Sequence, residues 1–294
     1  MDKKLLLILN PHSGQKRANR YIINIISLFT AAGYDCTVHT TQFNGDAPIY
    51  VKENAKGYDL IVCIGGDGTL NEVITGLINS GEDIPLGYIP SGSTNDFATS
   101  LGLSKNVMQA ARNIIKGKPR PYDIGSFNGR YFSYIASFGA FTKVSYDTPQ
   151  TLKNAMGHFA YVMEGIKELP AIKPIHVKIT ANNQVYEDDY IFGAVTNSTS
   201  VAGIVTLSPE LVNLSDGLLE VMLVKNPVTP VELSHIALTF TRKQFDKEAV
   251  RFFSADKIEI ETSSSVDWTI DGEYEQGAEK IVIENLKLAI KIVK

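Results

Sequence analysis

The residue pattern best suited to chemistry in this sequence is a glycine-rich run, Gly65-Gly66-Asp67-Gly68-Thr69-Leu70-Asn71-Glu72. Glycine lets the backbone come close to a ligand and tolerates positive φ. The run opens a helix-like segment, and the first turn of a helix presents free N–H groups that attract phosphate. Asp67 suits such a site if the phosphate arrives with Mg²⁺. The residues alone also fit a strand-to-helix turn with Asp67 as its N-cap.

Two polar loops have related positions in the sequence. Asn10-Pro11-His12-Ser13-Gly14 follows the first apolar segment, and Pro90-Ser91-Gly92-Ser93-Thr94-Asn95-Asp96 follows the fourth. In an open α/β sheet, ligands bind beyond the carboxyl ends of the strands, so we expect these loops to meet the glycine-rich run there. The run lacks the Gly-Lys-Ser/Thr of a P-loop and the glycine spacing of a dinucleotide fingerprint.

The elements that must position these residues alternate in the first part of the chain. Strand-like runs cover 5–9, 36–41, 60–64 and 86–89, and helical apolar spacing covers 20–32, 70–78 and 107–115. This alternation predicts βαβ units with a mainly parallel sheet. Two prolines in Lys118-Pro119-Arg120-Pro121 predict a linker or domain boundary.

The second part of the chain has the pattern of antiparallel strands. Asn128-Gly129 and Asn182-Asn183 are turn signals between strand-like runs. Further strands are predicted at 218–224, 258–261, 266–270 and 281–284, with helices at 155–167 and 231–241. We therefore predict an α/β N-terminal domain and a mostly antiparallel, β-sandwich-like C-terminal domain.

Taken together, the three loops resemble the catalytic domain of diacylglycerol and sphingosine kinases, most closely that of the soluble bacterial lipid kinases. The resemblance implies a phosphofructokinase-like domain of residues 1–122 plus 286–294 and a lipid-substrate domain of residues 123–285. It also implies that ATP is held between the two domains and that the last strand, 288–293, returns to the first domain.

The resemblance also implies roles for individual residues. Asp67 and Asp96 would help to place Mg²⁺-ATP. The residues expected to contact the nucleotide are Asn10, Pro11, His12, Ser13, Gly14, Thr41, Gly66, Asp67, Gly68, Thr69, Leu70, Asn71, Glu72 and Thr94. The family motif is usually Gly-Thr-Asn-Asp, and this chain has one residue more, so the alignment rests on Thr94-Asn95-Asp96.

An acidic pair in the C-terminal domain, Asp271-Gly272-Glu273, corresponds to the family's general base. A carboxylate within reach of a lipid hydroxyl can accept its proton while the bond to phosphorus forms. Asp271 is the predicted base, with Glu273 supporting it. Without the resemblance, Asp271-Gly272 is typical of a hairpin turn.

A second polar loop, Asn213-Leu214-Ser215-Asp216-Gly217-Leu218, resembles the family's structural Mg²⁺ site. There Asp216 would supply a carboxylate, and Asn213 and Leu218 would supply other oxygens. Asn213 contributes no charge where relatives often carry an acidic residue. The alternative is again a plain turn.

Charge and hydrophobicity indicate which partners the protein can have, nucleic acid or membrane. The formal net charge of −4 argues against a nucleic-acid partner. No run approaches the length of a membrane span. We expect a cytoplasmic enzyme, peripheral to the inner face of the membrane, that meets its lipid at the bilayer surface. The stretch 231–253 mixes apolar and basic residues as interfacial helices do.

The predicted reaction is transfer of the γ-phosphoryl group of ATP, with Mg²⁺, to a diacylglycerol-like membrane lipid. The alternatives are a NAD kinase, which shares the Gly-Gly-Asp-Gly motif, and a non-catalytic nucleotide- or lipid-binding protein. Lys16, Arg17 and Arg20 are candidates to neutralise phosphate charge or are solvated surface. Phosphatidylglycerol, a sphingoid base and undecaprenol also offer hydroxyls, and a homodimer is one candidate for the oligomeric state.

Overall fold

The computed structural model describes residues 3–13, 18–92, 95–139, 173–201, 205–207, 212–242, 245 and 249–294. Within it the chain forms two compact units. Unit 1 comprises residues 1–124 and 287–294, and unit 2 comprises residues 125–286. The predicted limits, 1–122 plus 286–294 and 123–285, differ from these by one or two residues. The predicted helix at 155–167 lies outside the described residues.

Unit 1 contains a parallel sheet. Its strands are β1 (Lys3–Leu9), β2 (Tyr34–Thr40), β3 (Leu60–Gly65) and β4 (Leu86–Pro90), in the spatial order β4-β3-β1-β2. All these neighbours pair in parallel. The last strand, β17 (Lys280–Val293), adds Ile292 beside Leu86, also in parallel. Every residue of β3 is buried, as expected for a strand covered on both faces.

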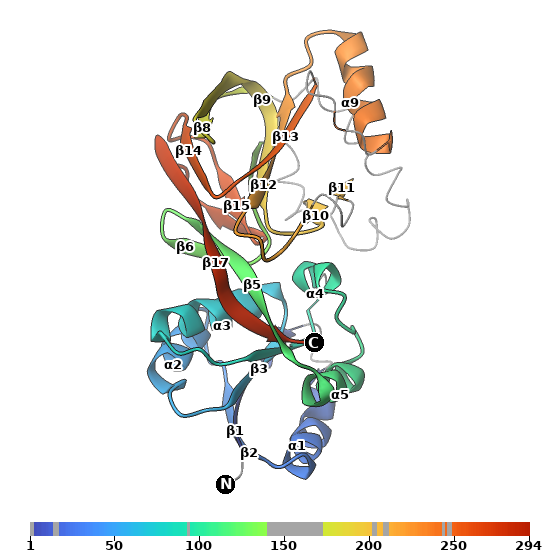
Figure 1. Cartoon of the computed structure of the whole chain (residues 1–294), viewed down its shortest axis with the longest axis vertical. Helices are drawn as coiled ribbons and strands as arrows, with labels where there is room; N and C mark the ends of the chain where they lie inside the picture. The colour runs from blue at the N-terminus through green and yellow to red at the C-terminus, as the bar shows by residue number, and fades with distance from the viewer. Residues whose placement is uncertain are drawn as a thin grey trace. The chain divides into compact units, whose positions relative to one another are not determined.

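Helices cover both faces of this sheet (Figure 1). One face carries α1 (Ile22–Ala31), which follows a short 3₁₀ turn η2 (Ala18–Tyr21), and α5 (Val107–Lys116). The core on that face contains Ile25, Phe29 and Ile114 together with alternate residues of β1 and β3. The other face carries α2 (Asp46–Asn54) and α3 (Asp67–Ser80).

Three features of unit 1 were not predicted. The segment Lys118–Pro121 was expected to be a linker, but β5 (Pro119–Phe127) begins there. Proline is tolerated at the start of a strand, where its missing N–H costs little. Helix α2 was not predicted, because it contains Pro48. This proline lies in the first turn of the helix, where proline is tolerated. Helix α4 (Asp96–Ser100) has only five residues, too few to show a period.

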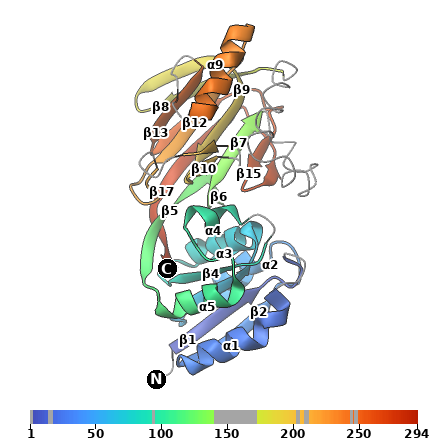
Figure 2. The ribbon, with the colours of Figure 1, turned by 90° about the vertical axis from the view of Figure 1, so that its right-hand side faces the viewer.

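Unit 2 is built from antiparallel strands (Figure 2). The predicted turns at Asn128-Gly129 and Asn182-Asn183 are confirmed, because all four residues have positive φ and each pair joins two paired strands. The strands are β6 (Arg130–Phe132), β7 (Ile135–Gly139), β8 (Ile175–Ala181), β9 (Gln184–Thr196), β10 (Ser200–Val201), β11 (Val205–Thr206), β12 (Leu219–Lys225), β13 (Val250–Ala255), β14 (Lys257–Glu261), β15 (Trp268–Ile270) and β16 (Glu273–Glu275).

The core of unit 2 surrounds the single tryptophan. Trp268 packs between Phe127 and Phe138, with both ring centroids 4.9 Å away. The predicted helix at 231–241 is confirmed as α9 (Pro230–Arg242), on one side of the sheet. The Trp268 side chain is 1% exposed.

Candidate active site

The three polar loops of unit 1 lie at one edge of its sheet. They follow β1, β3 and β4, which run in parallel, so their carboxyl ends coincide. Backbone hydrogen bonds extend the pairing into the loops. The N–H of Asn10 donates to the carbonyl of Ile64 (3.1 Å), and the N–H of Ser91 donates to the carbonyl of Gly65 (2.8 Å). The structure therefore brings the predicted loops together.

Side chains lock the loops to one another. The amide of Asn10 donates to Oγ1 of Thr69 across 3.0 Å, which joins the first loop to α3. The hydroxyls of Ser13 and Ser91 lie 2.7 Å apart, which joins the first loop to the third. These contacts fix the loops relative to one another.

Asp67 is not the N-cap residue of its own helix, the position that it would have in a simple strand-to-helix turn. Gly66 is the N-cap of α3, and Asp67 is the first helical residue. The two carboxylate oxygens of Asp67 accept the N–H groups of Asp96 (3.1 Å) and Phe97 (3.3 Å). Asp67 is thus buried and holds the first turn of α4, which brings the predicted residues Asp67 and Asp96 together.

Glu72 and Thr41 belong to the side of the site near β2. One carboxylate oxygen of Glu72 accepts the N–H of Gly45 across 2.7 Å, so it anchors the loop before α2. The N–H of Thr41 donates to the carbonyl of Leu9 across 2.9 Å, and the Thr41 side chain is buried. Both residues therefore border the same sheet edge.

The remaining predicted contacts differ in what their side chains can do. Pro11 and His12 lie in the loop after β1, and the N–H of His12 donates to Oδ1 of Asn10. Gly68 and Asn71 lie on the first turns of α3. The side chain of Leu70 is fully buried, so only its backbone could face a ligand. Gly14 and Thr94, with Lys16, Arg17 and Ser93, lie outside the described residues.

Sequence reasoning missed one polar residue beneath the loops, Tyr88 on β4. The hydroxyl of Tyr88 lies 3.4 Å from the carbonyl oxygen of Gly65 and 3.3 Å from Oδ1 of Asn95. Burial raises the pKa of Tyr88 well above its ordinary value, and the nearby carboxylate of Asp67 adds to this. A tyrosine in an otherwise apolar strand was the only available signal.

In unit 2, Asp271 and Gly272 form the two-residue turn between β15 and β16. Ile270 pairs with Glu273, and the two turn residues have φ of 49° and 86°. This is the hairpin geometry that Asp-Gly favours. The interpretation as a plain turn is therefore correct for the backbone, but it leaves out what the carboxylate does.

The Asp271 carboxylate is buried and accepts four hydrogen bonds. One oxygen accepts the N–H and the hydroxyl of Ser133, at 2.6 and 2.8 Å. The other accepts the N–H groups of Tyr134 and Ile135, at 3.0 and 3.1 Å. Burial raises the pKa of Asp271 above its ordinary value, and these hydrogen bonds oppose that rise. The carboxylate holds the start of β7 to the turn.

Glu273, two residues further on, is exposed and ion-paired. Its Oε2 lies 2.7 Å from a guanidinium nitrogen of Arg130. The same guanidinium also pairs with Glu275. Sequence reasoning missed Arg130, because it lies 143 residues away from Glu273 in the sequence.

The loop 213–218 forms a compact turn with oxygen donors. Oδ1 of Asn213 accepts from the N–H and hydroxyl of Ser215, and Oδ1 of Asp216 accepts the N–H of Leu218. The carbonyl of Leu218 accepts from Asn285 across 2.9 Å. An amide, a carboxylate and a carbonyl oxygen in one short loop fit the donor preference of Mg²⁺. Among the described residues, no cluster of three His, Cys, Asp or Glu suits a metal ion.

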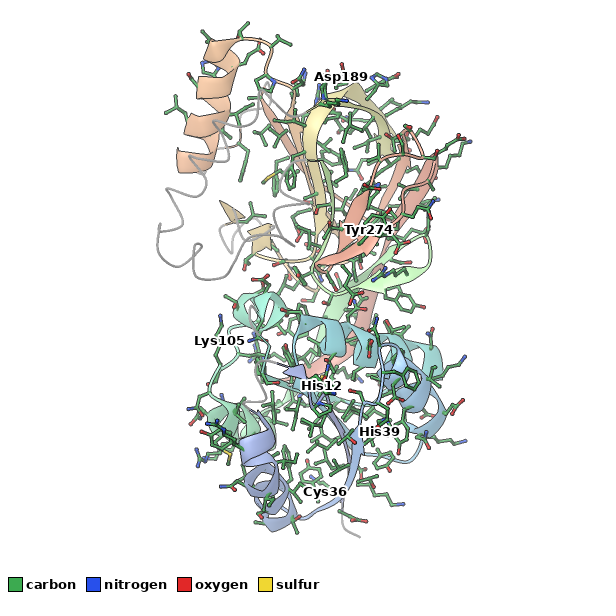
Figure 3. The ribbon with its side chains drawn as sticks, turned by 180° about the vertical axis from the view of Figure 1, so that it is seen from behind. His12, Cys36, His39, Lys105, Asp189 and Tyr274 are labelled. Atoms are coloured by element: carbon green, nitrogen blue, oxygen red, sulfur yellow. The ribbon has the colours of Figure 1, made fainter. Side chains whose placement is uncertain are left out.

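Within the described residues, the structure shows no paired arrangement of His12, His39 and Cys36 (Figure 3). His12 and His39 come from different elements of unit 1, and Cys36 lies elsewhere on β2 (Figure 3). His39 pairs with Asp46 at 3.1 Å and stacks on Tyr50, as expected for a structural histidine. Cys36 and Cys63 are both free thiols.

Two family profiles match this chain over nearly its whole length. The diacylglycerol kinase catalytic domain matches residues 4–127, and the YegS C-terminal NAD kinase beta sandwich-like domain matches residues 135–293. A diacylglycerol kinase of Bacillus subtilis (strain 168) is 34% identical over 274 residues, which are 92% of this chain and 90% of the relative. The chain belongs to the diacylglycerol kinase family. This confirms the family that the sequence motifs indicated.

Other members of the diacylglycerol kinase family agree with this assignment. A diacylglycerol kinase of Staphylococcus haemolyticus is 34% identical over 276 residues, covering 93% of this chain and 83% of the relative. A crystal structure of a diacylglycerol kinase from Bacillus anthracis str. Sterne superposes with a TM-score of 0.77 at 28% identity, covering 99% of this chain and 97% of the other. The predicted fold class, an α/β domain followed by a β-sandwich-like domain, is confirmed.

Proposed function

We propose that this protein is an ATP-dependent lipid kinase that transfers the γ-phosphoryl group of ATP to the hydroxyl of a diacylglycerol. The products would be a phosphatidic acid and ADP. Membership of the diacylglycerol kinase family supports the reaction class. The single observation that carries the proposal is the joining of three loops at the sheet edge of unit 1 by Asn10–Thr69 and Ser13–Ser91.

This sheet edge suits a triphosphate. The first turn of α3 begins directly after Gly66, and its N–H groups have no acceptors within the helix. Such a terminus attracts negative charge. The nucleotide contacts expected from the family, Asn10 to Gly14, Thr41, Gly66 to Glu72 and Thr94, extend this surface. Because Asp67 and Asp96 are acidic, we propose that the substrate is the magnesium complex of ATP, whose cation offsets their charge.

The proton of the lipid hydroxyl needs an acceptor, and we propose the acidic pair of unit 2 for this role. Asp271 is the expected base, and its raised pKa favours proton acceptance. Its oxygens already accept four hydrogen bonds, so one of these must lengthen when substrate binds. Glu273 would support Asp271 in this role, because its carboxylate is exposed and is oriented by the guanidinium of Arg130.

A structural Mg²⁺ is the second cation of the proposal. Asn213, Asp216 and the carbonyl of Leu218 would hold it, and it would stabilise the loop that precedes β12. Since Asp216 is the one carboxylate among these three donors, we expect weaker binding than at a site with two carboxylates.

The lipid must be met at a membrane surface. No helix within the described residues is long and apolar enough to span a bilayer. We propose that the enzyme is cytoplasmic and binds the inner face of the membrane peripherally. Val231 and Leu238 on α9 are exposed apolar side chains. A helix can bind a bilayer through apolar side chains of this kind. Absence of binding to anionic liposomes in a flotation assay at low salt would contradict peripheral binding.

The test of the proposed function is product analysis with two acceptors. The enzyme is incubated with γ-labelled ATP, Mg²⁺ and either dioleoylglycerol in mixed micelles or NAD. We expect label in phosphatidic acid and none in NADP. A panel of other lipid alcohols, including phosphatidylglycerol, a sphingoid base and undecaprenol, then defines the acceptor. Label in NADP alone would identify a NAD kinase, and ATP binding without any transfer would identify a non-catalytic protein.

Variants of the acidic pair test the base. Asp271→Asn is expected to lower kcat by a factor of 100 or more, the range of general-base contributions. Full activity of this variant would exclude Asp271 as the base. Glu273→Gln serves as the companion variant, because it keeps a hydrogen-bond acceptor for Arg130 and removes the charge.

A further inference from the structure

Two glycine loops at the sheet edge of unit 1 touch backbone to backbone. A Cβ atom built on Gly92 would lie 2.6 Å from Cα of Gly66, and one built on Gly66 would lie 3.2 Å from Cα of Gly92. The first distance is shorter than any real Cβ contact, so even alanine at position 92 would force the loops apart. The spacing between the loop after β3 and the loop after β4 is therefore set at this contact.

Asn95 holds Gly92 in this position. Its Oδ1 accepts the N–H of Gly92 across 2.9 Å, and its Nδ2 donates to the carbonyl of Gly92 across 2.9 Å. Both backbone groups of one glycine are thereby bound by one buried side chain. Asn95 itself has φ of 54°, a left-handed conformation that asparagine tolerates better than most residues.

Tyr88 ties this clamp to the strand beneath. Its side chain is 1% exposed, and its hydroxyl lies between Oδ1 of Asn95 (3.3 Å) and the carbonyl of Gly65 (3.4 Å). The same hydroxyl thus touches the residue before Gly66 and the residue that binds Gly92. It links the two sides of the glycine contact.

We propose that Tyr88 and Asn95 are positioning residues that set the distance between the Gly66 and Gly92 loops and thereby the affinity for the triphosphate of ATP. This inference rests on the proposed function and adds two residues to it. Neither side chain needs to touch the nucleotide, because each acts through the backbone of a glycine. The N–H groups that would bind phosphate follow Gly66 directly, so a shift of that glycine moves them.

The effect should appear in the binding of ATP and not in that of lipid. Tyr88→Phe removes one hydroxyl and keeps the ring, and Asn95→Gly removes the clamp while tolerating the positive φ. We expect the KM for Mg-ATP to rise about fivefold in Tyr88→Phe and about tenfold in Asn95→Gly, the scale of one and two lost hydrogen bonds. The KM for dioleoylglycerol should stay within a factor of two.

The double variant sharpens the test. If both residues act through the same glycine contact, Tyr88→Phe with Asn95→Gly should raise the KM for Mg-ATP no more than Asn95→Gly alone. Independent action would multiply the two effects and raise the KM for Mg-ATP about fiftyfold, which would overturn a shared action through the glycine contact. Tyr122→Phe is the matched control, since Tyr122 is also a buried tyrosine of unit 1 and lies under the ammonium of Lys294.

The outcomes separate the two proposals. If the wild-type protein transfers no phosphoryl group, the proposed function fails; if it also does not bind Mg-ATP, the clamp has no role in ATP affinity. If the wild type is active and either single variant keeps its KM for Mg-ATP, the positioning role is overturned alone. An equal rise in both KM values, or a change in kcat only, would also overturn it, because a merely structural defect would act in that way.

Discussion

The Asp271 carboxylate offers the most quantitative test of how unit 2 is held together. Replacing it with asparagine keeps the shape and changes one oxygen into an NH₂ group. The remaining carbonyl can still accept the N–H groups of Tyr134 and Ile135. The NH₂ group can then donate to the hydroxyl of Ser133, but the N–H of Ser133 is left without an acceptor.

These changes set the expected magnitude. An orphaned buried donor costs about 1–3 kcal/mol, and the other hydrogen bonds lose the assistance of a charge. A neutral amide is easier to bury than a carboxylate, which offsets part of the loss. We expect Asp271→Asn to lower the free energy of unfolding of unit 2 by about 3 kcal/mol.

The chain provides its own reporter for this measurement. Trp268 is the only tryptophan and is buried three residues before Asp271, on the same hairpin. Its fluorescence during urea unfolding therefore follows unit 2. Asp267→Asn is the matched control, because Asp267 is exposed and accepts one hydrogen bond from Tyr274, which an amide oxygen can replace. We expect the control to stay within about 0.5 kcal/mol of wild type.

The difference in stability between wild type and Asp271→Asn should depend on pH in a defined direction. Burial raises the folded-state pKa of Asp271 above its ordinary value of 3.8. The stability that this group contributes is therefore fully present below about pH 4 and falls as the pH rises through the folded pKa. The advantage of wild type over Asp271→Asn should narrow over that range. An Asp271→Asn protein that unfolds at the wild-type urea concentration would refute the role given to the four hydrogen bonds.

Three further predictions concern residues outside this turn. Glu72→Ala leaves the N–H of Gly45 without its acceptor and should destabilise the protein by about 1–2 kcal/mol in urea unfolding, whereas Glu72→Gln should keep most of that stability; equal effects would contradict the contact. Native protein should expose one reactive thiol to a disulfide reagent, Cys36, because Cys63 is fully buried and burial raises its pKa strongly; two fast thiols before unfolding would be inconsistent with the core. Hydrogen bonds that the His176 ring donates to the carboxylates of Asp189 and Glu187 raise the pKa of this exposed histidine. Its contribution to stability is therefore present below pH 6.5 and lost as the pH rises through the folded pKa. A His176→Gln variant should lack that decline in thermal denaturation curves, and identical curves would refute it.

Local patterns were enough to predict most of the fold. The apolar runs at 60–64 and 86–89 and the turns at Asn128-Gly129 and Asn182-Asn183 depend on neighbouring residues only, and all four are confirmed. The error at Pro119 arose because a boundary and a strand start favour the same residues. Helix α4 is held by Asp67, 29 residues before its first residue, so no local pattern could show it.

The site was predictable as a set of loops but not as a network. Motif order placed Asp67 and Asp96 in one region, and the structure brings them into hydrogen-bond contact. The partners that fix the loops, Tyr88 and Asn95, come from burial and backbone geometry that only the folded chain has. Arg130 beside Glu273 is likewise a product of the folded chain, since β6 and β16 are distant in sequence.

The most direct test of the central claim is the stoichiometry of phosphoryl transfer to a lipid. Purified enzyme, Mg²⁺ and ATP labelled at the γ-position are incubated with dioleoylglycerol in mixed micelles, and lipid-bound label and ADP are measured in the same samples. We predict one labelled phosphatidic acid for each ADP formed and no lipid label when ATP carries its label at the α-position. ADP formation without labelled lipid, or label that enters only a water-soluble acceptor, would contradict the account.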